Sequence, residues 1–255
     1  MAAPHSPQRV DTSVTAPIVA VVVLAVFAAS LMVDLVPRFH LGDSVTFMVT
    51  RLGGFIPDNR SWLYGLALGW LERATGALNA VALAQIVLSW AAIAAFTAAA
   101  ASALNLPRPW AALMLVVCAL EPLTYFWSRS FMADSAAQSV FVLLCAVLLT
   151  RTGGVARFAL VFAIGFLLIA LRVLYFPALA VGLVAATAWQ AWRCRRLGLR
   201  GAAADPDLRR WAISALAIVT ANFAYAGANM EMTSARSLST NVGGMAFLVA
   251  AFRPS

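Results

Sequence analysis

Long apolar runs, separated by short turns rich in arginine, glycine and proline, constrain the fold of this chain more than any other feature. A helix needs about 20 predominantly apolar residues to cross the hydrocarbon core of a bilayer. Runs that approach this length lie at about 17–36, 77–104, 110–127, 133–149, 155–171, 173–192 and 211–229. Because 63% of the residues are hydrophobic and only 11% are charged, we exclude a soluble domain and predict an all-α transmembrane bundle of about seven spans.

The turns between the runs indicate where each span ends. Two prolines in the turn 105–109 cannot continue a helix and therefore end the second run. The stretch 155–192 is too long for one crossing, so we expect the chain to turn back near Arg172. Residues 1–16 are polar and small and are expected to form a cytoplasmic tail, with residues 17–255 as a single transmembrane domain. The first run is longer than a typical signal-peptide core, which favours an uncleaved anchor over a cleaved signal.

The arginines predict which end of the bundle faces the cytoplasm. All 18 basic residues are Arg, and they concentrate in the loop 193–210 and in turns that share its side if the amino terminus is inside. The chain is then a multi-pass protein of the inner (cytoplasmic) membrane. Most acidic residues fall on or near the outer face in this orientation, namely Asp34, Asp43, Asp58, Glu72, Glu121, Asp134 and Glu231. We therefore expect carboxylates from distant segments to converge there.

The net charge of +8 does not indicate a nucleic-acid partner, because the arginines are scattered among apolar runs and form no basic stripe. Of the cysteines, Cys118 and Cys145 lie inside apolar runs and Cys194 stands apart, so we expect no disulfide framework. No zinc-type spacing of Cys and His occurs. A divalent metal stays an open possibility, since separated acidic residues do not by themselves define a site.

The longest polar interruption, residues 37–76, is predicted to be an outer loop. Its segments 44–52 and 62–71 have the pattern of short interfacial helices, and Trp62 and Tyr64 are aromatics suited to the headgroup layer. Ionisable side chains cluster in this loop. Charge beside a bilayer is costly unless it is hydrated or paired, so the cluster is a candidate functional site.

Within the loop, Asp43 follows Gly42, which lets backbone approach a ligand closely. Asp43 is either a catalytic carboxylate at the membrane surface or a helix cap. Arg60 and Tyr64 have the i,i+4 spacing that places two side chains on one helix face, where Arg can bind a phosphate. The alternative is an interfacial helix with a snorkelling arginine. His40, a lone histidine, is either structural or part of a substrate site.

A second polar link follows the third run. Glu121 lies in apolar surroundings, so it either pairs with Arg129 or has a functional role. Asp134 is either a cap of the fourth span or a second site carboxylate. Arg172 and Tyr175, between the fifth and sixth spans, either bind a lipid phosphate or mark the interface.

The amino-terminal span, the Gly42-Asp43-Ser44 sequence, Arg60-Ser61 with Tyr64, and the second acidic link around Asp134 together resemble the amino-terminal half of the GT-C superfamily. These are polytopic glycosyltransferases, similar to protein mannosyltransferases, that use polyprenyl-phosphate sugars. The resemblance extends over roughly residues 15–190 and rests on loose motifs. The chain departs from the family in having fewer spans, so a truncated or non-catalytic relative is an alternative.

The resemblance implies that a sugar is moved from a lipid-linked donor to a glycan, lipid or protein acceptor at the outer face. Asp43 would act as general base, and Asp134 would orient the acceptor or assist a metal. Arg60, Arg129 or Arg172 would neutralise the departing phosphate. A membrane transporter or lipid-flippase subunit is the competing class, and it predicts polar groups at mid-membrane depth.

Overall fold

A computed structural model describes residues 38–39, 43–53, 61–121, 126–196 and 205–232. The described chain is helical, as predicted, and its only β-pairing is a single parallel bridge between Arg38 and Ser130. The helices are α2 (Asp43–Gly53), α3 (Trp62–Thr75), α4 (Asn79–Leu104), α5 (Arg108–Ala119), α7 (Ala133–Leu149), α8 (Gly154–Leu171), α9 (Tyr175–Arg196) and α10 (Pro206–Met232).

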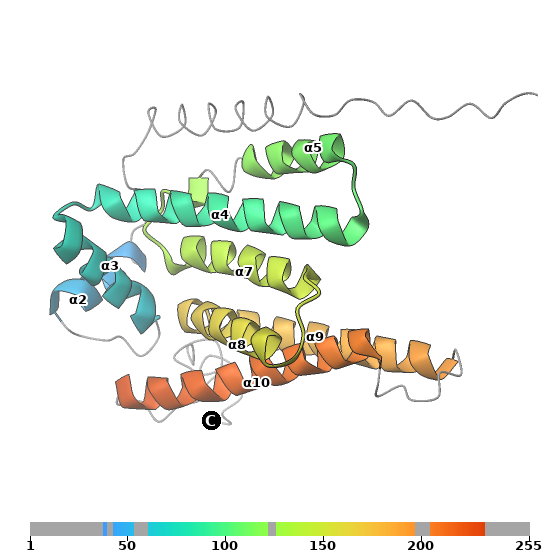
Figure 1. Ribbon diagram of the computed structural model, residues 1–255. Coiled ribbons are helices and arrows are strands. Elements are labelled where there is room, and N and C mark those ends of the chain that lie inside the picture. Colours follow the sequence, from blue (N-terminus) through green and yellow to red (C-terminus); the bar gives the residue numbers. More distant parts are fainter. Residues whose placement is uncertain (1–37, 40–42, 54–60, 122–125, 197–204, 233–255) are drawn as a thin grey trace, which may run out of the picture.

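The longer helices lie side by side with their axes roughly aligned, and the short helices α2 and α3 lie across one end of this bundle (Figure 1). Helices α4, α7 and α9 begin at the α2/α3 end, whereas α5, α8 and α10 begin at the opposite end (Figure 1). Helix α4 packs on α7, α7 on α8, and α8 and α9 on α10. Residues that lie near the starts and ends of different helices are thereby gathered at the two ends of the bundle.

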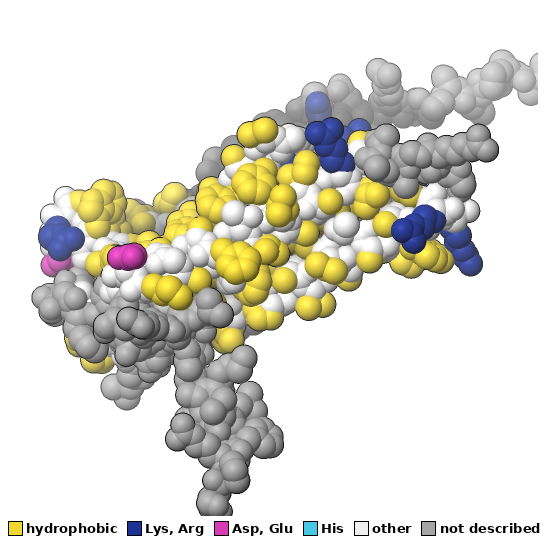
Figure 2. All heavy atoms as spheres, turned by 90° about the horizontal axis from the view of Figure 1, so that it is seen from below, with side chains coloured by type: hydrophobic (Ala, Val, Ile, Leu, Met, Phe, Trp, Pro, Cys, Tyr) yellow, Lys and Arg dark blue, Asp and Glu magenta, His cyan; other side chains and the backbone are white. Residues whose placement is uncertain are grey.

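Three of the described helices, α4, α8 and α10, are long and apolar enough to cross a membrane. Helices α5 and α7 are apolar but shorter, with 12 and 17 residues. On the face shown in Figure 2, hydrophobic side chains are spread along the whole bundle, and acidic side chains are seen only toward the α2/α3 end. This distribution is compatible with a membrane protein.

The helix boundaries predicted from the sequence agree closely with those of the structure for α4, α7 and α8, and poorly for α5. We expected a span over 110–127, but α5 ends at Ala119 and its C-cap is Leu120. Glu121 and Pro122 follow in the sequence, and a proline disfavours helical backbone in the residue before it. The first predicted span, 17–36, lies outside the described residues.

Small residues allow the helices to approach closely. A Cβ atom on Gly165 of α8 would lie 2.5 Å from the Cδ1 of Ile218 in α10, so a larger residue at position 165 would require the Ile218 side chain to shift. Leu168 and Ala217, in the same pair of helices, are fully buried. Within a membrane, such packing rather than exclusion of water holds helices together.

A buried arginine forms hydrogen bonds between helices at the end of the bundle opposite to α2 and α3. Arg157 in α8 is only 1% exposed. Its guanidinium donates to the carbonyl oxygens of Leu148, Thr150, Thr152 and Arg210 and to the Oγ of Ser214. A cation among the last carbonyls of a helix also interacts favourably with the helix dipole, so Arg157 stabilises the end of α7.

Candidate functional site

The segment before α7 is bound to α2 and to the chain that precedes it. Ser44, the second residue of α2, donates its hydroxyl to the carbonyl oxygen of Phe131 at 2.8 Å. Arg38 donates its N–H to the carbonyl of Arg129 at 2.9 Å and accepts from the N–H of Phe131 at 3.0 Å. Phe131 is fully buried. The backbone at Asp43, where α2 begins, is therefore held beside the segment that leads into α7.

Gln85 in α4 is the centre of a buried polar network at this end of the bundle. Its Oε1 accepts the hydroxyl of Tyr64 at 2.5 Å. Its Nε2 donates to the carbonyls of Ser128 and Ser130 and to the Oγ of Ser135, at 3.0 to 3.1 Å. The two amide hydrogens thus serve three acceptors, one of them shared, so both donors of this side chain are engaged. It fixes α3, α4 and the start of α7 relative to one another.

An ion pair joins the start of α7 to the end of α8. The Nε of Arg172 lies 2.7 Å from the Oδ1 of Asp134, and both side chains are partly exposed. Asp134 is not the N-cap, which is Met132, but belongs to the first turn of α7. A carboxylate there is stabilised by the positive end of the helix dipole. Two of the predicted site residues, distant in sequence, are thus in direct contact.

Two tyrosines flank this ion pair. The ring of Tyr175, at the start of α9, packs on Phe141 with centroids 5.3 Å apart. Burial raises the pKa of its hydroxyl, the negative charge of Asp134 adds to this effect, and the positive charge of Arg172 opposes it. Burial raises the pKa of the Tyr64 hydroxyl, and the negative charge of Asp134 acts in the same direction. The phenol therefore stays protonated and remains a hydrogen-bond donor.

An apolar groove of about 360 Å³ opens between α3, α4, α7 and α8. Leucine, valine, isoleucine and alanine side chains form nearly all of its wall, and Tyr64 and Gln85 are the polar residues in that wall. A groove with so little polar surface suits a hydrocarbon chain better than a hydrophilic ligand.

The groove lies next to the ion pair. Leu171 lines the groove and directly precedes Arg172. Ala136, which also lines it, is two residues after Asp134. A ligand whose chain occupied the groove would therefore place a charged head group beside one carboxylate and one guanidinium.

The other predicted residues are placed in part. Arg129 is fully buried in the segment before α7, and Glu121 is half-buried next to Leu120, the C-cap of α5. His40, Arg60 and the side chain of Asp43 lie outside the described residues. Where the structure describes the chain, no group of three His, Cys, Asp or Glu is placed to hold a metal ion.

Sequence reasoning missed the role of Gln85 and the existence of the groove. Gln85 was visible as a polar residue within an apolar run, and a polar side chain at such a position needs a partner. The groove had no sequence signal, because it depends on how side chains from four helices meet.

No family model, no curated protein and no solved structure matches this chain. The site must therefore be interpreted from its own geometry.

Proposed function

We propose that this protein is a membrane glycosyltransferase that moves a sugar from a polyprenyl-phosphate donor to an acceptor hydroxyl. The observation that carries the proposal is the apolar groove that runs up to the Asp134–Arg172 ion pair. A polyprenyl phosphate has the matching composition, with a long hydrocarbon chain and an anionic head. The resemblance to the GT-C superfamily supports the same substrate class.

The ion pair assigns different roles to its two members. Arg172 is partly exposed and can bind a phosphate oxygen while it stays in contact with Asp134. A carboxylate already paired with a guanidinium serves to position that guanidinium. We therefore give Asp134 the role of a positioning residue for Arg172 and leave the role of proton acceptor to Asp43.

The proposed reaction is a single displacement at the anomeric carbon. The acceptor oxygen attacks this carbon as its proton passes to the carboxylate of Asp43, and the bond from the anomeric carbon to the phosphate oxygen breaks. The electron pair of that bond leaves with the polyprenyl phosphate. Arg172 stabilises the negative charge that develops on the phosphate, and in a poorly hydrated site this interaction is strong.

The groove can be tested by filling it. Ala84 lines the groove, whereas Val87, one turn further along α4, is exposed and does not. We expect Ala84→Phe to weaken binding of a polyprenyl-phosphate sugar to the purified full-length protein by about tenfold. Val87→Phe is the matched control and should leave binding unchanged. Equal binding in both variants would contradict the proposed location of the lipid chain.

Catalysis is tested separately with Asp43→Asn. We expect this variant to bind the donor as well as the native protein does and to lose sugar transfer, because the acceptor hydroxyl has no proton acceptor. Transfer would be followed as release of polyprenyl phosphate from a radiolabelled donor. Full activity of Asp43→Asn would remove the proposed mechanism, even if the binding result stood.

A further inference from the structure

A hollow in the described part of the chain lies at the end opposite to the ion pair. Its volume is about 580 Å³, and it lies between the turn after α7 and the start of α10. Arg151, Arg209 and Arg210 line it, together with a single carboxylate, Asp207, which pairs with Arg210. The hollow therefore holds more positive than negative charge.

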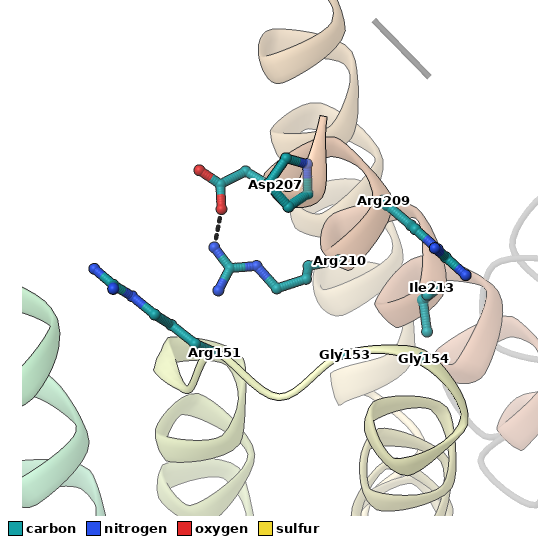
Figure 3. Close-up of a pocket in the computed structure, with 8 residues that line it drawn as sticks. Arg151, Gly153, Gly154, Asp207, Arg209, Arg210 and Ile213 are labelled. Atoms are coloured by element: carbon teal, nitrogen blue, oxygen red, sulfur yellow. Dashed lines mark ion pairs between the residues drawn. The ribbon is translucent and has the colours of Figure 1, made fainter. Parts of the chain in front are cut away.

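The backbone around the hollow also favours an anion. Helix α8 begins here at Gly154, its N-cap Gly153 makes no side-chain capping bond, and a Cβ at either glycine would meet nothing within 4 Å. The N–H groups of a first helical turn that lack a cap attract negative charge. Figure 3 shows Arg151 and Arg210 on one side of this turn and Arg209 on the other.

The arginine beneath the hollow does not compete for an anion. All three nitrogens of the Arg157 guanidinium donate to protein acceptors. Binding would therefore fall to the side chains that line the hollow. Orientation in the membrane explains why arginines lie at this end, but it does not require them to surround a hollow.

Apolar surface next to the hollow indicates where the ligand comes from. An adjoining hollow of about 360 Å³ shares Arg151 and Arg210 and is otherwise lined by the apolar residues Ala99, Ala103 and Leu149 and by the small polar residues Ser102 and Thr150. Val155, directly after Gly154, is 85% exposed. A soluble phosphate would make no use of this surface, whereas the acyl chains of a lipid would cover it.

We propose that this arginine-lined hollow binds the phosphate of an anionic membrane lipid. Basic pockets between transmembrane helices are a known form of lipid head-group site. The hollow shares no lining residue with the groove, and it lies at the opposite end of α7, a helix ~26 Å long, from the Asp134–Arg172 ion pair. It does not depend on the proposed glycosyl transfer.

The test uses the full chain in lipid nanodiscs, with a labelled phosphatidylglycerol as probe and phosphatidylcholine as background. We expect the double variant Arg151→Gln/Arg209→Gln to retain the probe about 25-fold less than the native protein does, at roughly fivefold for each arginine. The matched control is Arg193→Gln/Arg195→Gln, which removes two exposed arginines of α9 that do not line the hollow. Equal losses in the two double variants would overturn the proposal, because they would show a general charge effect.

Two further measurements test whether the ligand is a soluble phosphate and whether loss of binding comes from misfolding of the variant. Inorganic phosphate serves as a competitor, and displacement of the labelled lipid at a phosphate concentration similar to that of the lipid would show a site for soluble phosphate and overturn the proposal. A photoreactive residue at Ile213, which lines the hollow, should cross-link the probe in a protein that keeps all its arginines. Absence of this cross-link would also count against the proposal, whether or not the glutamine variant folds.

Discussion

At the scale of single residues, two buried polar side chains organise the two ends of the bundle. Gln85 joins three segments beside the candidate site, and Arg157 joins α7, α8 and α10 at the opposite end. A buried polar group stabilises a fold only when its hydrogen bonds are made, and removal of one partner leaves the others unsatisfied. These residues should therefore be more sensitive to substitution than the apolar residues around them.

We predict that Arg157→Leu lowers the free energy of unfolding by at least about 3 kcal/mol, because several carbonyl groups and the Ser214 hydroxyl lose their donor. The midpoint of thermal unfolding in detergent measures the effect. Arg195→Leu, at an exposed position, is the matched control and should change stability by less than about 0.5 kcal/mol. Similar midpoints for the two variants would mean that the buried hydrogen bonds contribute little.

Sequence reasoning identified the charged residues but could not show which groups each of them contacts. From the sequence, Arg157 is only one of the arginines that orient the protein, because a sequence does not show that five acceptors converge on it. Asp134 and Arg172 were both predicted as site residues, although their contact depends on the α7–α8 hairpin. A pairing between residues so far apart in sequence follows from the tertiary fold, which a single sequence does not determine.

At the scale of secondary-structure elements, packing on α3 fixes the backbone of α2, the helix that begins at Asp43. Phe47 of α2 packs edge-on against Tyr64 of α3, with ring centroids 4.9 Å apart. Next to this contact, a Cβ on Gly65 would lie 2.6 Å from the Cβ of Thr50 and 3.2 Å from the carbonyl oxygen of Phe47. The two helices can approach this closely only because residue 65 is a glycine.

We predict that Gly65→Ala moves α2 away from α3 and destabilises the protein by about 1–3 kcal/mol, as overpacking does. The same change should reduce sugar transfer, because α2 begins with Asp43. Gly182→Ala in α9 is the matched control, since a Cβ there meets nothing within 4 Å, and it should be neutral or slightly stabilising. Thermal unfolding and transfer activity would be measured on both variants. A Gly65→Ala variant with native stability and native activity would contradict the proposed close packing.

The elements themselves were predictable where composition changes abruptly. The fourth run was expected at 133–149, and α7 has these bounds, since polar residues precede it and Thr150 and Arg151 follow. The third run was overestimated because its hydrophobicity continues past Leu120, where the helix ends. Apolar composition shows that a segment can be buried in lipid, but it does not show where the helical hydrogen bonds stop.

At the scale of the whole molecule, the bundle has two chemically different ends. The Asp134–Arg172 pair and the network of Gln85 lie at the α2/α3 end, and Arg151, Arg209 and Arg210 lie at the other. The separation of ~26 Å along α7 is close to the thickness of a bilayer core. The positive-inside rule then predicts that the arginine-lined end faces the cytoplasm.

We predict that a cysteine introduced at Thr152 reacts with a membrane-impermeant thiol reagent only after the cells are permeabilised. A cysteine at Leu174, which is exposed beside Arg172, should react in intact cells. Both variants would be made in a chain whose three native cysteines are replaced by serine. The reverse pattern of labelling would invert the proposed orientation and move the site to the cytoplasmic face.

The hydrogen bonds of Arg157 also bear on how the protein is made. The nearest acceptors in sequence belong to the end of α7 and the turn after it, which are synthesised before Arg157, but the carbonyl of Arg210 and the hydroxyl of Ser214 follow it by 53 and 57 residues. A charged side chain that enters lipid without its partners is costly. We therefore expect Arg157 to reach its full set of hydrogen bonds only after α10, the last of the described helices in the sequence, has been synthesised.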